Sequence, residues 1–342
     1  MASQGTSLKT YVLTRLALVL PMVWILLTMV FLLMRVAPGD PISASLGGHV
    51  APAQIAVIKH QLGYDKPLLT QYGNYLWDTV RGDFGTTISD RRPVTEIIKV
   101  NGAATLELTF FAMIVAVSVG LLVGLVAGRF RDTPLDVGGR LFGIVIYAMP
   151  VFFLGYLAQL FFGSYLGVLP TSDQASPITQ ALLTTHTNIY LLDAAIDGNW
   201  SAFWDVFRHL ILPATTLGLV IGGIFIRLVR VNVIRTLRDD YIEAARARGI
   251  PERAVVYRHA FRNALVPVVT VVGLQMALLL SGAVLTETTF NWPGLGHELI
   301  VYLSNRDYAG VQGIIVVFSL VVVFVSVLID LVSAAIDPRI RY

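Results

Sequence analysis

The chain has 342 residues, of which 55% are hydrophobic and only 14% are charged. Soluble domains carry roughly 25% charged residues, so this composition predicts a polytopic membrane protein rather than a soluble domain. The formal net charge is +3, and the absence of cysteine excludes a disulfide framework, a thiolate metal site and a cysteine nucleophile.

Six long apolar runs follow one another along the chain, each near or above the ~20 residues that a helix needs to cross a bilayer. Helices are the form that such runs take in lipid, because backbone polar groups must be satisfied within the segment. The runs are residues 16–34, 108–128, 141–170, 209–226, 263–286 and 308–329. The sequence therefore predicts an all-α polytopic membrane protein with six transmembrane helices.

The segments around these runs divide the chain into three parts. Residues 1–36 comprise an N-terminal segment and the first transmembrane helix, and residues 37–100 are expected to form an extracytoplasmic helical cap. APGDP at residues 37–41 ends the first span, and two short amphipathic helices are expected within residues 51–67 and 69–85. Residues 101–342 form the core with the other five spans and further outer loops at 171–207 and 287–307.

The positions of Lys and Arg predict the orientation of the chain. Cytoplasmic loops of membrane proteins carry an excess of both residues. Nine Arg lie between Arg227 and Arg262, whereas the short loops on the opposite side contribute only Arg208 and Arg306. We therefore expect a multi-pass protein with both termini, and the Arg-rich segment, in the cytoplasm.

Four polar side chains in or beside the spans are candidates for a path through the membrane or its gate. An intramembrane carboxylate is costly and is a functional hypothesis by default. The alternatives are solvation at the outer end of a span for the two carboxylates, and hydrogen bonding between helices for the two amides. The four are Glu107, Gln159, Gln275 and Glu287.

The sequence holds none of the patterns typical of catalysis or of a bound cofactor. It contains no phosphate-binding glycine loop, no His and Glu zinc pattern and no nucleophile elbow. We therefore expect no catalytic residues, no metal site and no cofactor in this chain.

The Arg-rich segment is predicted to be a helix–turn–helix on the cytoplasmic membrane face. Asp240 is a suitable N-cap, and Glu243 three residues later completes a capping box. Gly249 suits a left-handed helix end, and Pro251 prevents continuation. Small side chains at Ala244 and Ala245 predict close approach to another protein; the alternative is a helix that rests its Arg residues on anionic lipid.

A family resemblance favours the first alternative. Glu243-Ala244-Ala245, followed after three residues by Gly249, resembles the EAA loop of ABC importer permeases. RGDFGTT at 81–87, HLILPATTLG at 209–218, GAVLTETTFNWPGLG at 282–296 and DPRIRY at 337–342 are similar to the B-type permease subunit of dipeptide and oligopeptide importers. Together these motifs cover nearly the whole chain.

This resemblance implies a type I importer permease fold in a bacterial cytoplasmic membrane, with a coupling loop at about residues 233–263. The implied contacts with the ATPase are Asp240, Glu243, Ala244, Ala245, Arg246, Arg248 and Gly249. The implied partners are a C-type permease, two ATP-binding cassette subunits, an extracytoplasmic peptide-binding protein, peptide and lipid, with no nucleic acid. ATP and Mg would bind the ATPase subunits.

Other readings remain open at the level of sequence. The same family includes importers of nickel chelates and of glutathione. A self-contained secondary transporter would need an ion-coupling site, and the sparse carboxylates and lack of a visible internal repeat disfavour it. An intramembrane enzyme would need a convergent nucleophile or metal set.

Overall fold

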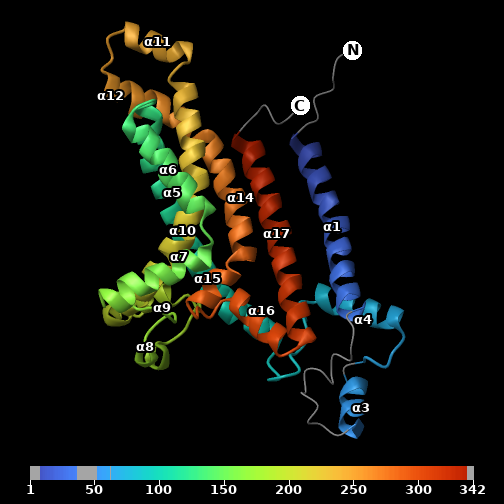
Figure 1. The fold of residues 1–342 in the computed structure, drawn as a ribbon. Coiled ribbons are helices and arrows are strands. Elements are labelled where there is room, and N and C mark those ends of the chain that lie inside the picture. The colour runs from blue at the N-terminus through green and yellow to red at the C-terminus, as the bar shows by residue number, and fades with distance from the viewer. Residues whose placement is uncertain (1–7, 37–51, 62, 337–342) are drawn as a thin grey trace, which may run out of the picture.

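The computed structural model describes residues 8–36, 52–61 and 63–336 (Figure 1). Within these ranges the secondary-structure elements are all helices, and Thr86 and Pro93 form an isolated antiparallel β-bridge. The predicted all-α fold is confirmed. Residues 37–51 of the expected cap and the DPRIRY motif lie outside the described residues.

Five long helices form the body of the molecule. They are α1 (Leu8–Val36), α5 (Val94–Arg129), α10 (Trp200–Thr236), α14 (Val266–Gly282) and α17 (Tyr308–Ile336). The shorter elements are α3 (Pro52–Gln61), α4 (Leu68–Val80), α6 (Pro134–Ala148), α7 (Val151–Ala158), α8 (Pro177–Leu182), α9 (Tyr190–Ile196), α11 (Asp240–Ala247), α12 (Glu252–Ala254), α13 (Phe261–Ala264), α15 (Val284–Thr289) and α16 (Leu295–Ser304), with π-helical segments η1 (Gln159–Tyr165) and η2 (Val255–Ala260).

Four helices are long and apolar enough to cross a membrane on their own: α1, α5, α10 and α17. Two bent helix pairs bring the number to six if each pair is one span. The first pair, Pro134–Ala148 with Val151–Tyr165, is bent by 103°, so a single helix over residues 141–170 was a wrong expectation. Pro150 explains the break, because the residue before a proline is pushed out of the helical region, and Met149 has φ −79° and ψ 129°.

Close packing of α5 on α10 forms the centre of the bundle. Gly120, Gly124 and Gly128 lie one turn apart on α5, and α10 fills the space that their side chains would occupy. A Cβ at Gly120 would lie 2.2 Å from Phe225 Cβ, and one at Gly128 would lie 2.9 Å from Val233 Cβ. The small residues in this span therefore allow helix contact, as expected for membrane bundles.

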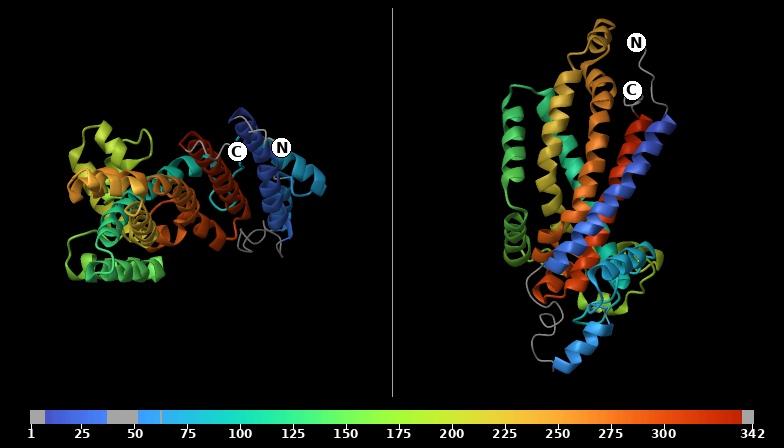
Figure 2. Two further views of the ribbon diagram at one scale, coloured as in Figure 1. Left: turned by 90° about the horizontal axis from the view of Figure 1, so that it is seen from above. Right: turned by 90° about the vertical axis from the view of Figure 1, so that its right-hand side faces the viewer.

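The two ends of the molecule differ in character. α11 and α12 lie at one end, the α11 end, and α3, α4, α8, α9 and α16 lie at the other, the cap end (Figures 1 and 2). The first turn of α1 and the last turn of α17 lie toward the α11 end (Figure 1). This arrangement separates the Arg-rich segment from the loops expected outside.

Candidate functional site

Helix α11 lies beyond the bundle and is attached through the end of α10 and through η2. Its buried side is a small apolar cluster of Ile242, Ala245, Val255 and Ala260. Asn263 Nδ2 also donates to the Tyr241 hydroxyl at 2.8 Å, which joins α11 to α13. α11 is therefore a short helix held rigidly against the start of the next span.

The turn after α11 has the glycine-dependent geometry that the sequence predicted. Gly249 has φ +75°, in the left-handed region. Its N–H donates to the Arg246 carbonyl at 2.9 Å, and the N–H of Ile250 donates to the Ala245 carbonyl at 3.3 Å. This pair of bonds is a Schellman motif, in which an apolar contact between Ile250 and the helix completes the cap.

The start of α11 differs from the predicted capping box. Asp239, not Asp240, is the N-cap residue, and no side chain makes a capping hydrogen bond. Asp240 is instead the first residue of the helix, and Glu243 is exposed. Both carboxylates still lie in the first turn, where the positive end of the helix dipole stabilises negative charge.

The two alanines of the EAA pattern face opposite environments. Ala245 is 1% exposed and packs inside the α11–η2 cluster, whereas Ala244 is exposed. The expectation that both alanines present a surface to a partner is therefore wrong for Ala245. Burial of Ile242 and Ala245 on one side leaves Asp240, Glu243, Ala244 and Arg246 among the exposed residues that a partner could contact.

Arg246 and Arg248 also bond within the chain. Arg246 Nη2 donates to Glu252 Oε1 at 2.9 Å, and Nε donates to Oε2 at 3.1 Å, which clamps α11 to α12 across the glycine turn. Arg248 Nε donates to the Ala244 carbonyl at 3.2 Å. Arg246 remains a charged group on the surface of the turn, with its position fixed by Glu252.

At the cap end, the buried Glu287 on α15 accepts a hydrogen bond from the first turn of the next helix, α16. Its Oε1 accepts from the Thr105 hydroxyl at 2.7 Å, and its Oε2 accepts from the N–H of His297 in the first turn of α16 at 2.9 Å. Gly294, the N-cap residue of α16, has no side chain that could make a capping bond. Burial raises the pKa of the Glu287 carboxyl, and the hydrogen bonds from Thr105, His297 and Gly296 oppose that shift.

The glycines of the NWPGLG motif make room for this carboxylate. A Cβ at Gly294 would lie 2.2 Å from Glu287 Cδ, and one at Gly296 would lie 2.8 Å from Oε2. Gly294 has φ −89°, so its backbone conformation does not itself require glycine. The two glycines of the motif thus leave the space that the Glu287 side chain occupies.

Replacing Gly294 with alanine should displace Glu287 and destabilise the cap-end loops by about 1–3 kcal/mol, as overpacking usually does. Thermal unfolding of the purified full complex and substrate uptake would measure the effect. Gly138→Ala on α6 is the control, because a Cβ there would meet nothing within 4 Å. Unchanged stability and uptake in Gly294→Ala would contradict the assigned role of the glycine.

Glu107 holds the other cap-end loop. The side chain is 2% exposed; Oε2 accepts from Gln174 Nε2 at 2.6 Å, and Oε1 accepts from the Leu191 N–H at 2.8 Å. Leu191 lies in the first turn of α9. Glu107 therefore connects α5 to both ends of the loop that carries α8 and α9, and it is buried rather than solvated at a span end.

The two candidate amides occupy different positions. Gln159 Nε2 donates to the carbonyls of Thr171 at 2.7 Å and Thr289 at 3.0 Å, so it joins the loop after η1 to α15. Gln275 is half-buried on α14. Glu107, Gln159 and Glu287 thus all anchor cap-end loops, whereas no hydrogen bond within the described residues joins Gln275 on α14 to them.

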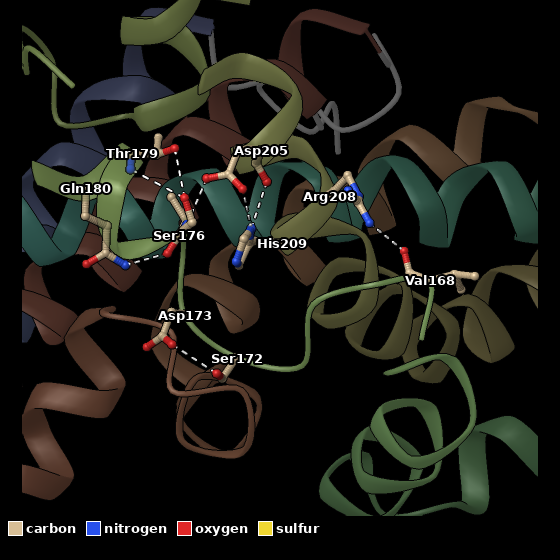
Figure 3. Close-up of polar contacts among 10 residues, drawn as sticks. Val168, Ser172, Asp173, Ser176, Thr179, Gln180, Asp205, Arg208 and His209 are labelled. Atoms are coloured by element: carbon tan, nitrogen blue, oxygen red, sulfur yellow. Dashed lines mark hydrogen bonds and ion pairs between the residues drawn. The ribbon is translucent and has the colours of Figure 1, made fainter. Parts of the chain in front are cut away.

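Polar contacts also fix the loop between η1 and α8 against α10 (Figure 3). Asp205 accepts from the Ser176 N–H at 2.8 Å, and Arg208 Nη2 donates to the Val168 carbonyl at 2.8 Å. Farther along, Asn291 Nδ2 donates to Asp173 Oδ1 at 2.5 Å. These bonds join the two cap-end loops into one connected surface.

Two buried carboxylates in the structure were missed by the sequence reasoning. Asp136 binds Arg230 through Nε at 2.5 Å and Nη2 at 2.8 Å, which ties α6 to α10. Asp307 accepts from the N–H groups of Ile88 and Ser89, each at 2.7 Å. Arg230 comes just after the apolar run at 209–226, and Asp307 stands just before the run at 308–329. These positions were signals of a paired charge and of a helix start.

No cluster of three or more His, Asp or Glu with metal-binding arrangement occurs in the described part of the chain. The polar groups at the cap end bond to backbone N–H groups, hydroxyls and amides of the same chain. The arrangement holds the loops in place at the cap end and α11 in place at the other end. Between them, α5 and α10 pack closely through small residues.

These features define a class: an all-helical integral membrane protein with ordered helical loops at both ends of its bundle. The chain belongs to the family of binding-protein-dependent transport system inner membrane components, and residues 120–342 match the model of that family. Residues 8–101 match the model of the N-terminal region of such membrane components.

Named relatives align over almost the full chain. It is 37% identical to the dipeptide transport system permease protein of Alkalihalophilus pseudofirmus, over 97% of this chain and 99% of that protein. It is 37% identical to the dipeptide permease of Escherichia coli, covering 97% and 98%. It is 36% identical to the glutathione transport system permease protein of Salmonella choleraesuis, covering 97% and 99%. A solved amino acid ABC transporter chain has 14% identity and a TM-score of 0.48, with 70% of this chain and 94% of that chain covered.

Proposed function

We propose that this chain is a permease subunit of an ABC importer that carries dipeptides or short oligopeptides. The observation that carries the proposal is the rigid α11 turn at the end opposite the cap, with an exposed Glu243 and Ala244 surface. Because α11 is fixed in this way, a displacement of α11 by a bound protein is transmitted to α10 and α14. The names of the dipeptide permeases at 37% identity support the substrate class.

The partners follow from this role. A second, C-type permease completes the path, two ATPase subunits bind at the α11 end with ATP and Mg, and a peptide-binding protein docks on the cap. Asp240, Glu243, Ala244, Arg246, Arg248 and Gly249 form or shape the surface for the ATPase, and Ala245 supports it from inside. This chain itself hydrolyses nothing.

The cap-end anchors act on the outer gate. Glu107, Gln159 and Glu287 hold the loops that surround the outer mouth, so they influence the gate through loop position rather than by contact with peptide. Gln275, half-buried on α14, is the remaining candidate for the path itself.

Glutathione is the second candidate substrate, because a glutathione permease aligns at 36% identity over the same length. Deleting the gene for this chain in its host and restoring it would test both. We expect ATP-dependent uptake of labelled dialanine to disappear and return; loss of glutathione uptake alone would favour the alternative. Uptake of both substrates that persists without the chain would overturn the importer proposal.

In the proposed orientation, the α11 end faces the cytoplasm of the bacterial cell. Since the chain lacks cysteine, Arg248→Cys provides a single label site on an exposed residue. In spheroplasts, we expect a membrane-impermeant maleimide to leave Arg248→Cys unlabelled and to label Ser304→Cys at the cap end. Labelling of Arg248→Cys from outside would reverse the orientation.

A further inference from the structure

A polar cavity of about 340 Å³ lies between α1, α4 and α17, at the cap end and away from the α5–α10 core. Arg35 in the last turn of α1 and Gln312 in the second turn of α17 contribute to its wall. The remaining wall comes from α4 and the segments on either side of it. The volume falls within the roughly 300–1,000 Å³ typical of small-ligand pockets.

The cationic part of the wall is pre-arranged. Arg35 Nε donates to Gln71 Oε1 at 2.9 Å, and the guanidinium lies over the Tyr64 ring at 4.3 Å and the Phe31 ring at 5.0 Å. Gln71 Nε2 donates to the carbonyls of Tyr64 and Lys66, which fixes the orientation of its amide. Arg35 is therefore held in one position by Gln71 and the two rings, and no ion pair joins it to a carboxylate of the described residues.

Lys66 adds a second cation to the same wall. Its ammonium nitrogen lies 3.7 Å from the position that a Cβ on Gly63 would take, so the side chain folds back along the Gly63 turn. Gly63 has φ +69°, which positions this turn between α3 and α4.

Two carboxylates balance these cations. Asp78 lies in the last turn of α4, and Asp83 follows it with its N–H bonded to the Asp78 carbonyl at 2.9 Å. Asp83 Oδ1 accepts from the Gly85 N–H at 2.9 Å, which holds the carboxylate in place. The cavity wall thus carries two cations, Arg35 and Lys66, and two anions, Asp78 and Asp83, whose formal charges cancel.

The hydroxyl of Tyr75 is buried in the wall beside α17. The Tyr75 hydroxyl oxygen is inaccessible and makes no hydrogen bond of normal geometry within the described part of the chain, although the Gln312 amide lies beside it. Burial raises the pKa of Tyr75 to about 12, so the group stays a neutral donor.

We propose that this cavity binds a dipolar molecule carrying both an ammonium and an acidic group. Arg35 and Lys66 would bind the carboxylate or phosphate, and Asp78 with Asp83 would bind the ammonium. A simple anion or a simple cation would meet a pair of like charges, whereas a zwitterion satisfies both pairs. A free dipeptide and a phosphatidylethanolamine headgroup share this chemistry, and the proposal does not depend on what the importer transports.

The test uses the complete transporter complex, purified without its binding protein, in two arms. In nanodiscs of phosphatidylglycerol alone, binding of radiolabelled glycylglycine is compared with that of its N-acetylated form. In the second arm, native mass spectrometry measures phosphatidylethanolamine retained against phosphatidylglycerol. The cavity variants are Arg35→Met, which keeps the apolar packing on Phe31 and Tyr64, and the double variant Asp78→Asn with Asp83→Asn.

The control variant is Arg81→Met, because Arg81 stacks on Trp77 at 4.4 Å and does not line the cavity. We expect at least one dipolar ligand to bind the unmodified chain and to lose about tenfold in affinity or occupancy in both cavity variants, but not in Arg81→Met. The arm that shows the loss identifies the source of the ligand. Absence of dipolar binding in both arms, or binding that both cavity variants retain, would overturn the proposal.

Discussion

Gly249→Val should lower substrate uptake by at least about tenfold while the chain stays in the membrane at its normal level. The φ of +75° costs a residue with a side chain roughly 1–2 kcal/mol, and tenfold corresponds to about 1.4 kcal/mol. A Cβ at this position would meet nothing within 4 Å, so the strain comes from the backbone alone. Relief of that strain breaks the bonds to Ala245 and Arg246 and redirects α11.

Gly249→Asn is the matched control, because asparagine enters the left-handed region more readily than other residues with side chains. We expect uptake by the asparagine variant to lie near that of the unmodified chain, and Gly249→Ala to lie between the two. The measurements are uptake of labelled dipeptide, membrane content of the chain and co-purification of the ATPase subunits. Normal uptake by Gly249→Val would remove the turn from the coupling pathway.

The sequence was sufficient to predict the helical fold because apolar length alone determines which segments span a bilayer. It was less informative about continuity. The run at 141–170 is uninterrupted in hydropathy, yet Pro150 bends it by 103°. The outer parts of α5 and α10 were also underestimated, since Val94–Arg129 and Trp200–Thr236 begin before the apolar windows at 108 and 209. In the outer part of α5, Asn101, Thr105 and Glu107 are buried by tertiary contacts, which hydropathy does not register.

Among the candidate residues, features set by neighbours in the sequence were predictable, whereas features set by tertiary contacts were not. The Gly249 turn depends on neighbours in sequence, and its left-handed geometry was predictable. The inward direction of Ala245 depends on Val255 and Ala260, which approach only after the chain has turned. Glu107 and Glu287 were predicted from the cost of a carboxylate near a membrane, but their partners come from distant loops that no local pattern identifies.

Replacing Ala244 with tryptophan should abolish both ATPase co-purification and peptide uptake without destabilising the chain. Ala244 is exposed on α11, so a large side chain there meets solvent in the isolated chain and a partner surface in the complex. Ala181→Trp is the control for ATPase co-purification and for thermal stability, because Ala181 is an exposed alanine on α8, at the cap end and away from α11. If α11 rests on lipid instead, the tryptophan strengthens membrane adhesion and ATPase association persists.

Ala245→Trp should fail for a different reason, and the comparison separates coupling from folding. Ala245 is 1% exposed among Ile242, Val255 and Ala260, so the indole cannot fit without moving η2. Overpacking of this kind costs typically about 1–3 kcal/mol. We therefore expect Ala245→Trp to lower the temperature of unfolding as well as ATPase association, whereas Ala244→Trp lowers association alone. Equal thermal stability of the two variants would contradict the inward packing of Ala245, and undiminished association in Ala244→Trp would contradict docking through the exposed face of α11.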